Sequence, residues 1–405
     1  MADRLNTGDS AWMLVSFAMV LLMTPGLALF YGGMVRAKNL ISVLYMSFVS
    51  IAVVTVVWFL YGYGLAFGPD LGGAGLIGWG DWGFLGTTTP SVAYGRIPLL
   101  VFSLFQLVFA IITLALVSGA VANRVRLGPW MVFGVVWMTL VYVPIAHWVF
   151  SSGGWIHRWG VLDFAGGLLV ELNSGVAGLA MALVLGPSVR LRREGPPEPK
   201  NVPMVMTGMG LLWFGWFGFN GGSALTDGAL AANAVTNTMM CACVAMITWM
   251  LLERRRFGRF SRLGGTTGAL AGLVAITPAC GYVNLVGASV IGIVAAVVCA
   301  YAVEIKTSAG YDDTLDVVGI HGAGGIVGLV LLGLFATGAY GSPISGLFFG
   351  GSAALLGKQV VAILAVGAYT FVLTYLIGKV VDRLFRLRAS ASEQAQGLDS
   401  ELRLD

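Results

Sequence analysis

The sequence predicts an all-α membrane protein with eleven transmembrane helices, and three observations support this prediction. Of the 405 residues, 58% are hydrophobic and only 10% are charged, and the mean hydropathy is +0.87, far from the values of a soluble globular domain. Apolar runs of about 20 residues, the length that crosses the hydrocarbon of a bilayer, recur along the whole chain. The 58 glycines are spread through these runs, as in membrane helices whose backbones approach closely.

Eleven apolar runs, separated by short polar or Gly/Pro-rich breaks, are the predicted spans. They centre near residues 21, 53, 109, 140, 174, 211, 240, 272, 295, 327 and 370. The first run, Ala11 to Tyr31, is too long for a signal peptide and lacks a positive segment before it, so we expect a retained span. The eighth, within Gly264 to Cys280, is short and ends at Pro278.

The basic residues predict the orientation of the chain. If the N-terminus is outside, all but four of the 23 Lys and Arg residues fall in inner loops or in the C-terminal tail. The four are Arg4, Arg96, Arg158 and Lys358. Cytoplasmic loops carry such an excess, so we expect the C-terminus in the cytoplasm and the protein in the cell inner (cytoplasmic) membrane. The formal charge of +4 follows from these loops and indicates no nucleic-acid partner.

The eleven spans divide into five, five and one. The fifth begins VLDFAGG and carries Glu171, and the tenth begins TLDVVGIHGAGG and carries His321. Each has an aspartate ahead of it, Asp163 and Asp316. Matching polar residues in two halves are typical of inverted-repeat transporters, whose sites lie at the midplane between the halves. We therefore expect halves at about residues 10–187 and 202–338, a last helix at about 357–380, a transmembrane domain over 1–380 and a cytoplasmic tail at 381–405.

Ionisable groups inside the membrane are the first candidates for function, because a carboxylate at the centre of a membrane helix costs about 2.5 to 3.5 kcal/mol. Glu171 and His321 are predicted to face each other across a shared pore, where the pair can hold one proton between them. The alternative is a buried ion pair that only fixes the register of two helices. Asp163 and Asp316 lie early in their helices, where carboxylates stabilise free N–H groups, so a structural role is favoured for both. His147 lies near an outer end.

Aromatic residues form a second candidate group. Phe105 and Phe109 lie four residues apart on one helix face, and the stretch LLWFGWFGFNGGSA places several aromatic residues just before Ser223. Such a stripe usually packs in a core. Aromatic faces also attract cations, however, and a serine hydroxyl beside them can accept a hydrogen bond from an N–H donor.

Other classes of site are not supported. GGSAALLGKQ lacks the glycine spacing and the Ser/Thr of a phosphate-binding loop, so nothing indicates ATP hydrolysis. The three histidines do not have metal-ligand spacing, and His157, between two tryptophans of an outer loop, is predicted to lie at the membrane interface. We therefore expect no metal, no cofactor and no enzyme activity. Four cysteines lie in apolar runs without CxxC spacing, as small core residues do: Cys241, Cys243, Cys280 and Cys299.

Six stretches, in order, resemble the successive signatures of the ammonium transporter (Amt/Mep/Rh) family, in its bacterial and archaeal Amt branch. They are TPGLALFYGGMVRAKN, PIAHWVF, LDFAGG, WFGWFGFNGGSA, ITPACGY and DVVGIHGAGGIVG, and together they cover nearly the whole chain. The resemblance implies an eleven-helix homotrimer in which each subunit has its own narrow hydrophobic pore, two inverted five-helix halves and a final helix that faces lipid.

The resemblance also implies a recruitment site at the outer mouth. It would bind ammonium through Phe109, Ser223 and the aromatic residue of HWVF, which is Phe150, with Asp163 as structural support. Most members have HWVW there. Because tryptophan offers the best face to a cation, we expect the cation site of this chain to be weaker.

Inside the pore, the resemblance makes Phe109 and Phe219 the stacked phenylalanines that block the passage. Of the two pore histidines of the family, the second falls on His321. Most members have a histidine where this chain has Glu171, so the pair becomes Glu/His, as in some fungal Mep proteins. Further candidates to line the pore are Phe105, Trp216 and Thr277.

The tail departs from the family pattern as well. It ends GLDSELRLD, which keeps GLD but loses the usual HGE and AY elements. A cytoplasmic PII-type regulatory protein is a possible partner that this divergent tail argues against.

Together these residues predict an ammonium transporter. Ammonium would be gathered at the outer site, lose its proton near the phenylalanine gate and cross as NH3, while the proton passes separately along Glu171 and His321. The main alternative is an ammonium sensor with little or no flux. Sensors of this family usually carry an appended effector domain, and the roughly 25 residues after Val380 are too few for one. A channel for a neutral solute such as CO2 is a second alternative, against which Ser223 and the aromatic mouth argue.

Overall fold

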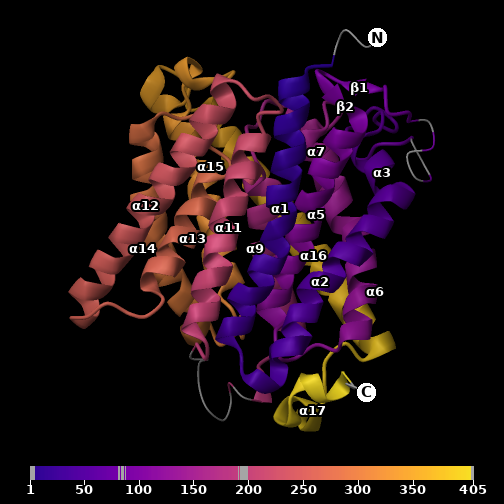
Figure 1. Ribbon diagram of the computed structural model, residues 1–405, viewed down its shortest axis with the longest axis vertical. Helices are drawn as coiled ribbons and strands as arrows, with labels where there is room; N and C mark the ends of the chain where they lie inside the picture. The colour runs from indigo at the N-terminus through magenta and orange to yellow at the C-terminus, as the bar shows by residue number, and fades with distance from the viewer. Residues whose placement is uncertain are drawn as a thin grey trace.

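The computed structural model describes residues 5–80, 83, 86, 88–189, 191 and 199–402, and over these residues the chain is a bundle of long helices (Figure 1). Within them, ten apolar helical segments are long enough to cross a membrane, and α13 (Gly264–Ile276) is a shorter apolar helix. Each of these segments contains one of the predicted centres. The all-α membrane architecture expected from composition is therefore confirmed, with α13 as the short eighth segment.

The first half contributes five segments, several of them built from consecutive helical elements. They are α1 (Thr7–Met34); η2 (Ala37–Asn39), α2 (Leu40–Val57), η3 (Trp58–Gly62) and α3 (Tyr63–Phe67); α5 (Leu99–Val121); α6 (Leu127–Trp137), η4 (Met138–Tyr142), α7 (Val143–Phe150) and α8 (Trp155–Arg158); and η5 (Gly167–Leu172) with α9 (Asn173–Leu185). The elements η3, η4 and η5 are π-helical turns. Such turns are rare in proteins and frequent at functional sites.

The second half repeats this plan with α13 in the third position. Its elements are α11 (Val202–Gly222), α12 (Ala229–Phe257), α13, α14 (Leu285–Ala309), and the π-helical turn η6 (Val318–Gly322) with α15 (Ala323–Phe335). The last long helix, α16 (Ala354–Phe385), is longer at both ends than the sequence suggested.

Short elements close the two ends of the bundle. The strands β1 (Ala93–Tyr94) and β2 (Ile97–Pro98) form an antiparallel hairpin beside the N-terminal end of α1, and the 3₁₀ turns η7 (Gly338–Tyr340) and η8 (Leu347–Phe349) precede α16. The hairpin and the N-terminus lie at the top of Figure 1 and the C-terminal tail at the bottom. We name these the outer and the inner end, following the predicted orientation.

Glycines allow the first helices of the two halves to pack closely. A Cβ on Gly208 of α11 would lie 2.3 Å from the backbone nitrogen of Phe30 in α1, and one on Gly215 would lie 2.1 Å from Met23 Cγ. Both distances are shorter than a Cβ tolerates. Lipid is as apolar as the helices, so the hydrophobic effect does not hold membrane helices together, and small residues at such positions allow the close van der Waals contact that does.

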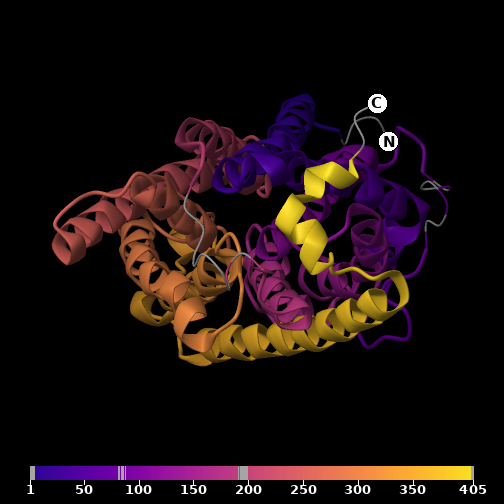
Figure 2. The same cartoon turned by 90° about the horizontal axis from the view of Figure 1, so that it is seen from below.

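The helix α16 lies along one flank of both halves, as Figure 2 shows. Its inward side is tied by polar contacts: Thr370 donates to Asn173 Oδ1 at 2.9 Å, and Thr374 accepts from Trp137 Nε1 at 2.9 Å. Its other side exposes apolar residues such as Leu364 and Val372. This is the distribution expected of a final helix that faces lipid.

The C-terminal tail folds back under the first half (Figure 2). It contains α17 (Ala391–Gln396) and the 3₁₀ turn η9 (Leu398–Glu401). The Asp399 carboxylate accepts the backbone N–H groups of Ile41 and Ser42 at 3.0 and 2.8 Å, so it caps the start of α2. Arg126, ahead of α6, pairs with Glu393 at 2.5 Å.

Candidate functional site

Glu171 and His321 form a buried pair inside the bundle. His321 Nδ1 lies 2.6 Å from Glu171 Oε2, and the two side chains are 3% and 1% exposed, respectively. The other carboxylate oxygen, Oε1, has no hydrogen-bond partner among the described residues. One proton shared between the ring and the carboxyl makes either a neutral pair or an ion pair. The structure thus brings together the two polar residues that the sequence singled out.

Both members of the pair lie on π-helical turns in corresponding spans, Glu171 in η5 and His321 in η6. Three glycines let these spans touch. A Cβ on Gly175 would lie 2.2 Å from the backbone nitrogen of Gly322, and one on Gly325 would lie 3.1 Å from Glu171 Cβ. Composition shows that glycine is frequent, but not which glycines make this contact.

Two stacked phenylalanines lie between the pair and the outer end. The rings of Phe109 in α5 and Phe219 in α11 have centroids 4.1 Å apart and planes 16° apart, and both side chains are 1% exposed. Phe105 meets Phe109 edge-on at 4.9 Å. The two rings are therefore stacked as the family resemblance implied, and their role as a gate stays a prediction.

Trp216 and Thr277 lie beside this stack. Trp216 Nε1 donates a hydrogen bond of 2.9 Å to Thr277 Oγ1, and the Trp216 ring centroid is 5.8 Å from that of Phe219. The hydrogen bond fixes the indole beside the Phe219 ring, and both side chains are buried.

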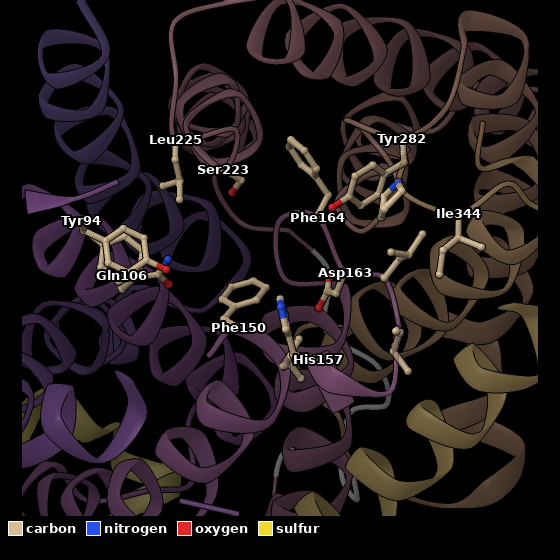
Figure 3. Close-up of a pocket in the computed structure, with 16 residues that line it drawn as sticks. Tyr94, Gln106, Phe150, His157, Asp163, Phe164, Ser223, Leu225, Tyr282 and Ile344 are labelled. Atoms are coloured by element: carbon tan, nitrogen blue, oxygen red, sulfur yellow. The ribbon is translucent and has the colours of Figure 1, made fainter. Parts of the chain in front are cut away.

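An open cavity of about 350 Å³ lies at the outer end (Figure 3). Phe150, Ser223 and Asp163 line it, and the Phe150 ring meets the Phe109 ring edge-on at 6.4 Å. The Ser223 hydroxyl donates to the Phe219 carbonyl at 2.8 Å, which leaves the hydroxyl oxygen as an acceptor. Ser223 follows Phe219 by about one helical turn, so the cavity lies close to the stacked rings.

Asp163 shapes the cavity through the backbone as well as through its charge. Its carboxylate accepts the N–H groups of Gly166, Gly167 and Leu168 at 2.9, 2.6 and 2.8 Å, so it caps the start of η5 as the sequence predicted. Burial raises the pKa of Asp163 to about 6, although these N–H groups act in the opposite direction. Above that pH the carboxylate supplies negative charge to the cavity.

The counterpart of Asp163 in the second half is Asp313, and the prediction that Asp316 caps its helix was wrong. Asp313 accepts the N–H groups of Val317 and Val318 at 3.1 and 2.7 Å. It precedes the polar residue of its span by eight residues, as Asp163 does. Aligning the two halves by their Leu-Asp sequences pairs Asp163 with Asp316, whereas the structure pairs Asp163 with Asp313.

Asp316 has another arrangement. Its backbone is left-handed, with φ of +63°, and its Oδ1 atom lies 2.6 Å from Lys306 Nζ. A positive φ is uncommon outside glycine and turns the chain away from a regular helix start. The carboxylate consequently reaches Lys306 of α14, whereas the N–H groups of Val317 and Val318 donate to Asp313.

Several residues that line the outer cavity were not predicted as part of it, and three of them carry polar groups of interest. Tyr94, Gln106 and His157 line it (Figure 3), and His157 is the one that the sequence placed at the membrane interface. Gln106 had a signal, since it is a polar residue within the apolar run FSLFQLVFA. Tyr94 had none, because the β-hairpin brings it there.

His147, by contrast, is buried away from the cavity. Its Nδ1 atom lies 2.9 Å from the Ala66 carbonyl and its Nε2 atom 3.3 Å from Asp70 Oδ1, so it ties α7 to the end of α3. Among the described residues, no three His, Cys, Asp or Glu side chains are grouped to hold a metal ion.

The chain is similar to known proteins along nearly its whole length. The profile described as the Ammonium Transporter Family matches residues 11–402. A putative ammonium transporter of Methanothermobacter thermautotrophicus and the ammonium transporter of Bacillus subtilis are each 46% identical to this chain, over 98% of it and 97% of their own length. The crystal structure of Saccharomyces cerevisiae Mep2 is 38% identical with a TM-score of 0.87, over 96% of this chain and 89% of that chain. A structure described as a sensor Amt protein is 28% identical with a TM-score of 0.89, over 99% of both chains.

Proposed function

Because the chain belongs to the ammonium transporter family, we propose that it carries ammonium across a membrane through a pore that contains Phe109, Phe219, Glu171 and His321. One observation carries the proposal above the others: a carboxyl and an imidazole in contact at 2.6 Å inside an apolar bundle. Such a pair takes up and passes on a proton where an isolated charge is costly.

Recruitment would take place in the outer cavity. The face of Phe150 and the charge of Asp163 attract a cation. The Ser223 hydroxyl and the Gln106 side-chain carbonyl accept hydrogen bonds from N–H groups. Na⁺ has no N–H groups to donate, so these acceptors favour ammonium over a metal cation of the same charge.

The phenylalanine gate would then act on the charge of the substrate. A hydrated cation cannot pass the stacked rings of Phe109 and Phe219, and a dehydrated one pays a large desolvation cost in an apolar pore. Ammonia without its proton is small and neutral, and it passes when a ring moves aside. Deprotonation at the gate is therefore the favoured route.

The proton would cross along Glu171 and His321. The pair gains one proton on its outer side and releases one on its inner side, so its own charge is restored after each cycle. One NH3 and one proton cross for each ammonium ion, and they recombine at the inner end. Transport is consequently expected to move one positive charge per ammonium.

Electrical recording from proteoliposomes on a solid-supported membrane tests this proposal. Glutamine cannot accept the proton, so Glu171→Gln should lower the current evoked by an ammonium pulse by about tenfold or more. Glu171→His keeps a proton-carrying side chain and should keep the current, with an altered pH dependence. Na⁺ pulses serve as the control. A parental ammonium current in Glu171→Gln at every pH would rule out the relay.

For the assembly and location we infer a homotrimer in the cytoplasmic membrane, with the N-terminus outside, a transmembrane domain over 1–380 and the tail of 381–405 in the cytoplasm. The distribution of Lys and Arg supports the orientation, and the family resemblance supports the trimer. Transport without enzyme activity agrees with the relatives being transporters. A PII-type partner is disfavoured by the divergent tail.

An ammonium sensor is the second candidate, favoured by the similarity to a sensor Amt protein over 99% of both chains. The two functions differ in flux. A transporter gives a sustained ammonium current in proteoliposomes, whereas a sensor binds ammonium in an equilibrium assay and gives no current beyond that of protein-free liposomes.

A further inference from the structure

At the inner end of the bundle, which the proposed function makes the inner mouth of the pore, lies an ammonium group that belongs to the chain itself. Lys306 Nζ lies 2.6 Å from Asp316 Oδ1 and donates a hydrogen bond of 2.8 Å to the backbone carbonyl of Asp313. Both Lys306 and Asp316 line a cavity of about 500 Å³ at the inner end. The lysine side chain is 17% exposed and that of Asp316 36% exposed, while the Asp316 oxygen that faces the lysine is buried. The ion pair is therefore half-buried in the wall of this cavity.

Local structure places the lysine at this position. The turn η6 packs closely on α14, as Gly319 shows: a Cβ at this position would lie 2.7 Å from Val303 Cγ1. Lys306 follows Val303 by about one helical turn and so reaches the start of η6. The left-handed backbone of Asp316 turns its carboxylate to meet it. Such a conformation persists only where its surroundings hold it.

The outer cavity is also lined by a carboxylate, that of Asp163, which caps η5 as Asp313 caps η6. It differs from the inner cavity in its basic residues: His157 is the one basic side chain among the described residues that line it. In the inner cavity the lysine fills the place of a cation. Glu304 also lines that cavity, and its carboxylate pairs with Arg256 at 2.9 Å.

We propose that Lys306 is a tethered ammonium group that occupies the inner cation site and keeps the affinity of the inner mouth for free ammonium low. This inference rests on the function proposed above. A bare Asp316 carboxylate in a half-buried site would hold ammonium as it leaves the pore. A tethered cation competes at high effective concentration, so ammonium from the cytoplasm does not collect at the exit. Uptake therefore resists inhibition by its own product.

Uptake of ¹⁵N-ammonium into right-side-out membrane vesicles loaded with unlabelled ammonium tests the inference. The assay is run at pH 6, where little ammonium is present as NH3, and vesicles without the protein give the background. In Lys306→Met, the internal ammonium concentration that halves uptake should fall about fivefold, the size of a partly exposed ion pair. Lys306→Arg keeps the charge and should match the parent.

Two further variants separate charge from packing. Lys358→Met removes the same charge near the outer cavity, and it should leave the half-inhibiting concentration unchanged. Lys306→Met combined with Asp316→Asn removes the carboxylate as well, and it should return this concentration towards the parental value. If Lys306→Met does not accumulate, Asp316→Asn alone should raise the concentration, because the unpaired lysine then repels ammonium.

The outcomes distinguish the two proposals. If parental vesicles take up no more label than vesicles without the protein, the proposed transport function fails. If parental vesicles take up label and the half-inhibiting concentration is the same in Lys306→Met, or falls equally in Lys306→Arg, the inference about Lys306 is overturned while the transport function stands.

Discussion

Among single residues, Phe150 should determine how strongly the outer cavity attracts a cation. Its ring lines the cavity and meets Phe109 edge-on. A cation–π contact at an accessible site is worth about 0.5 to 1 kcal/mol, and tryptophan offers the best face, so Phe150→Trp should lower the KM of the ammonium current by at most about fivefold. Phe348→Trp, on the exposed turn η8, is the control. An unchanged KM in Phe150→Trp would remove this residue from recruitment.

Asp163 should make recruitment depend on pH. Its pKa of about 6 is raised by burial, so its negative charge is present above that pH and lost below it. The KM for ammonium should therefore rise as the outer pH falls through about 6, while ammonium itself stays protonated. Asp163→Asn keeps one acceptor for the N–H groups of η5 and should lose this dependence. His157→Gln tests the histidine that also lines the cavity; loss of the dependence in that variant and not in Asp163→Asn would contradict the assignment to Asp163.

The same raised pKa predicts the sign of an effect on folding. The native carboxyl of Asp163 binds its proton more readily than an unfolded aspartate, whose ordinary pKa is 3.8. The native state therefore holds more protons between about pH 4 and 6, and stability should decrease as pH rises through this window. Thermal unfolding in detergent should give a smaller slope against pH for Asp163→Asn. An identical slope in the two proteins would contradict this origin.

At the scale of the elements, the stability of the two spans that carry Glu171 and His321 should depend more on close contacts at glycine than on helix propensity. Gly175→Ala places a Cβ 2.2 Å from the backbone of Gly322, so the fifth and tenth spans must separate, at a cost of about 1 to 3 kcal/mol. The midpoint of thermal unfolding should fall and the ammonium current should be lost. Gly367→Ala in α16, whose added Cβ meets no atom within 4 Å, should be neutral or stabilising. Equal midpoints in the two variants would contradict the argument.

At the scale of the whole molecule, the tail is held to the bundle by polar contacts and by buried apolar side chains such as Leu387 and Leu398. Asp399→Ala removes both bonds to the start of α2 and should release the tail to a protease that cleaves after arginine at Arg386 or Arg388. The thermal midpoint of the bundle should stay the same, because its apolar core is untouched. Gln396→Ala, on the exposed side of α17, is the control. Equal cleavage rates in the two variants would show that other contacts hold the tail.

The sequence by itself determined the class of the protein, the positions of its apolar helices and its most informative polar residues. Hydropathy, glycine content and the distribution of Lys and Arg are properties of local stretches, so they can be read without a fold. The signatures around Glu171, His321, Phe109 and Phe219 named residues that the structure brings into contact. Their roles in transport stay predictions that the experiments above test.

Only the tertiary structure decided which groups share a space. Asp313, and not Asp316, caps the tenth span, because a left-handed backbone at Asp316 breaks the match between the halves. Tyr94 and Gln106 reach the outer cavity, and Lys306 reaches the inner one, through contacts between segments far apart in the chain. Such proximities depend on how the helices pack against each other, and this packing cannot be read from hydropathy or from residue spacing along the chain.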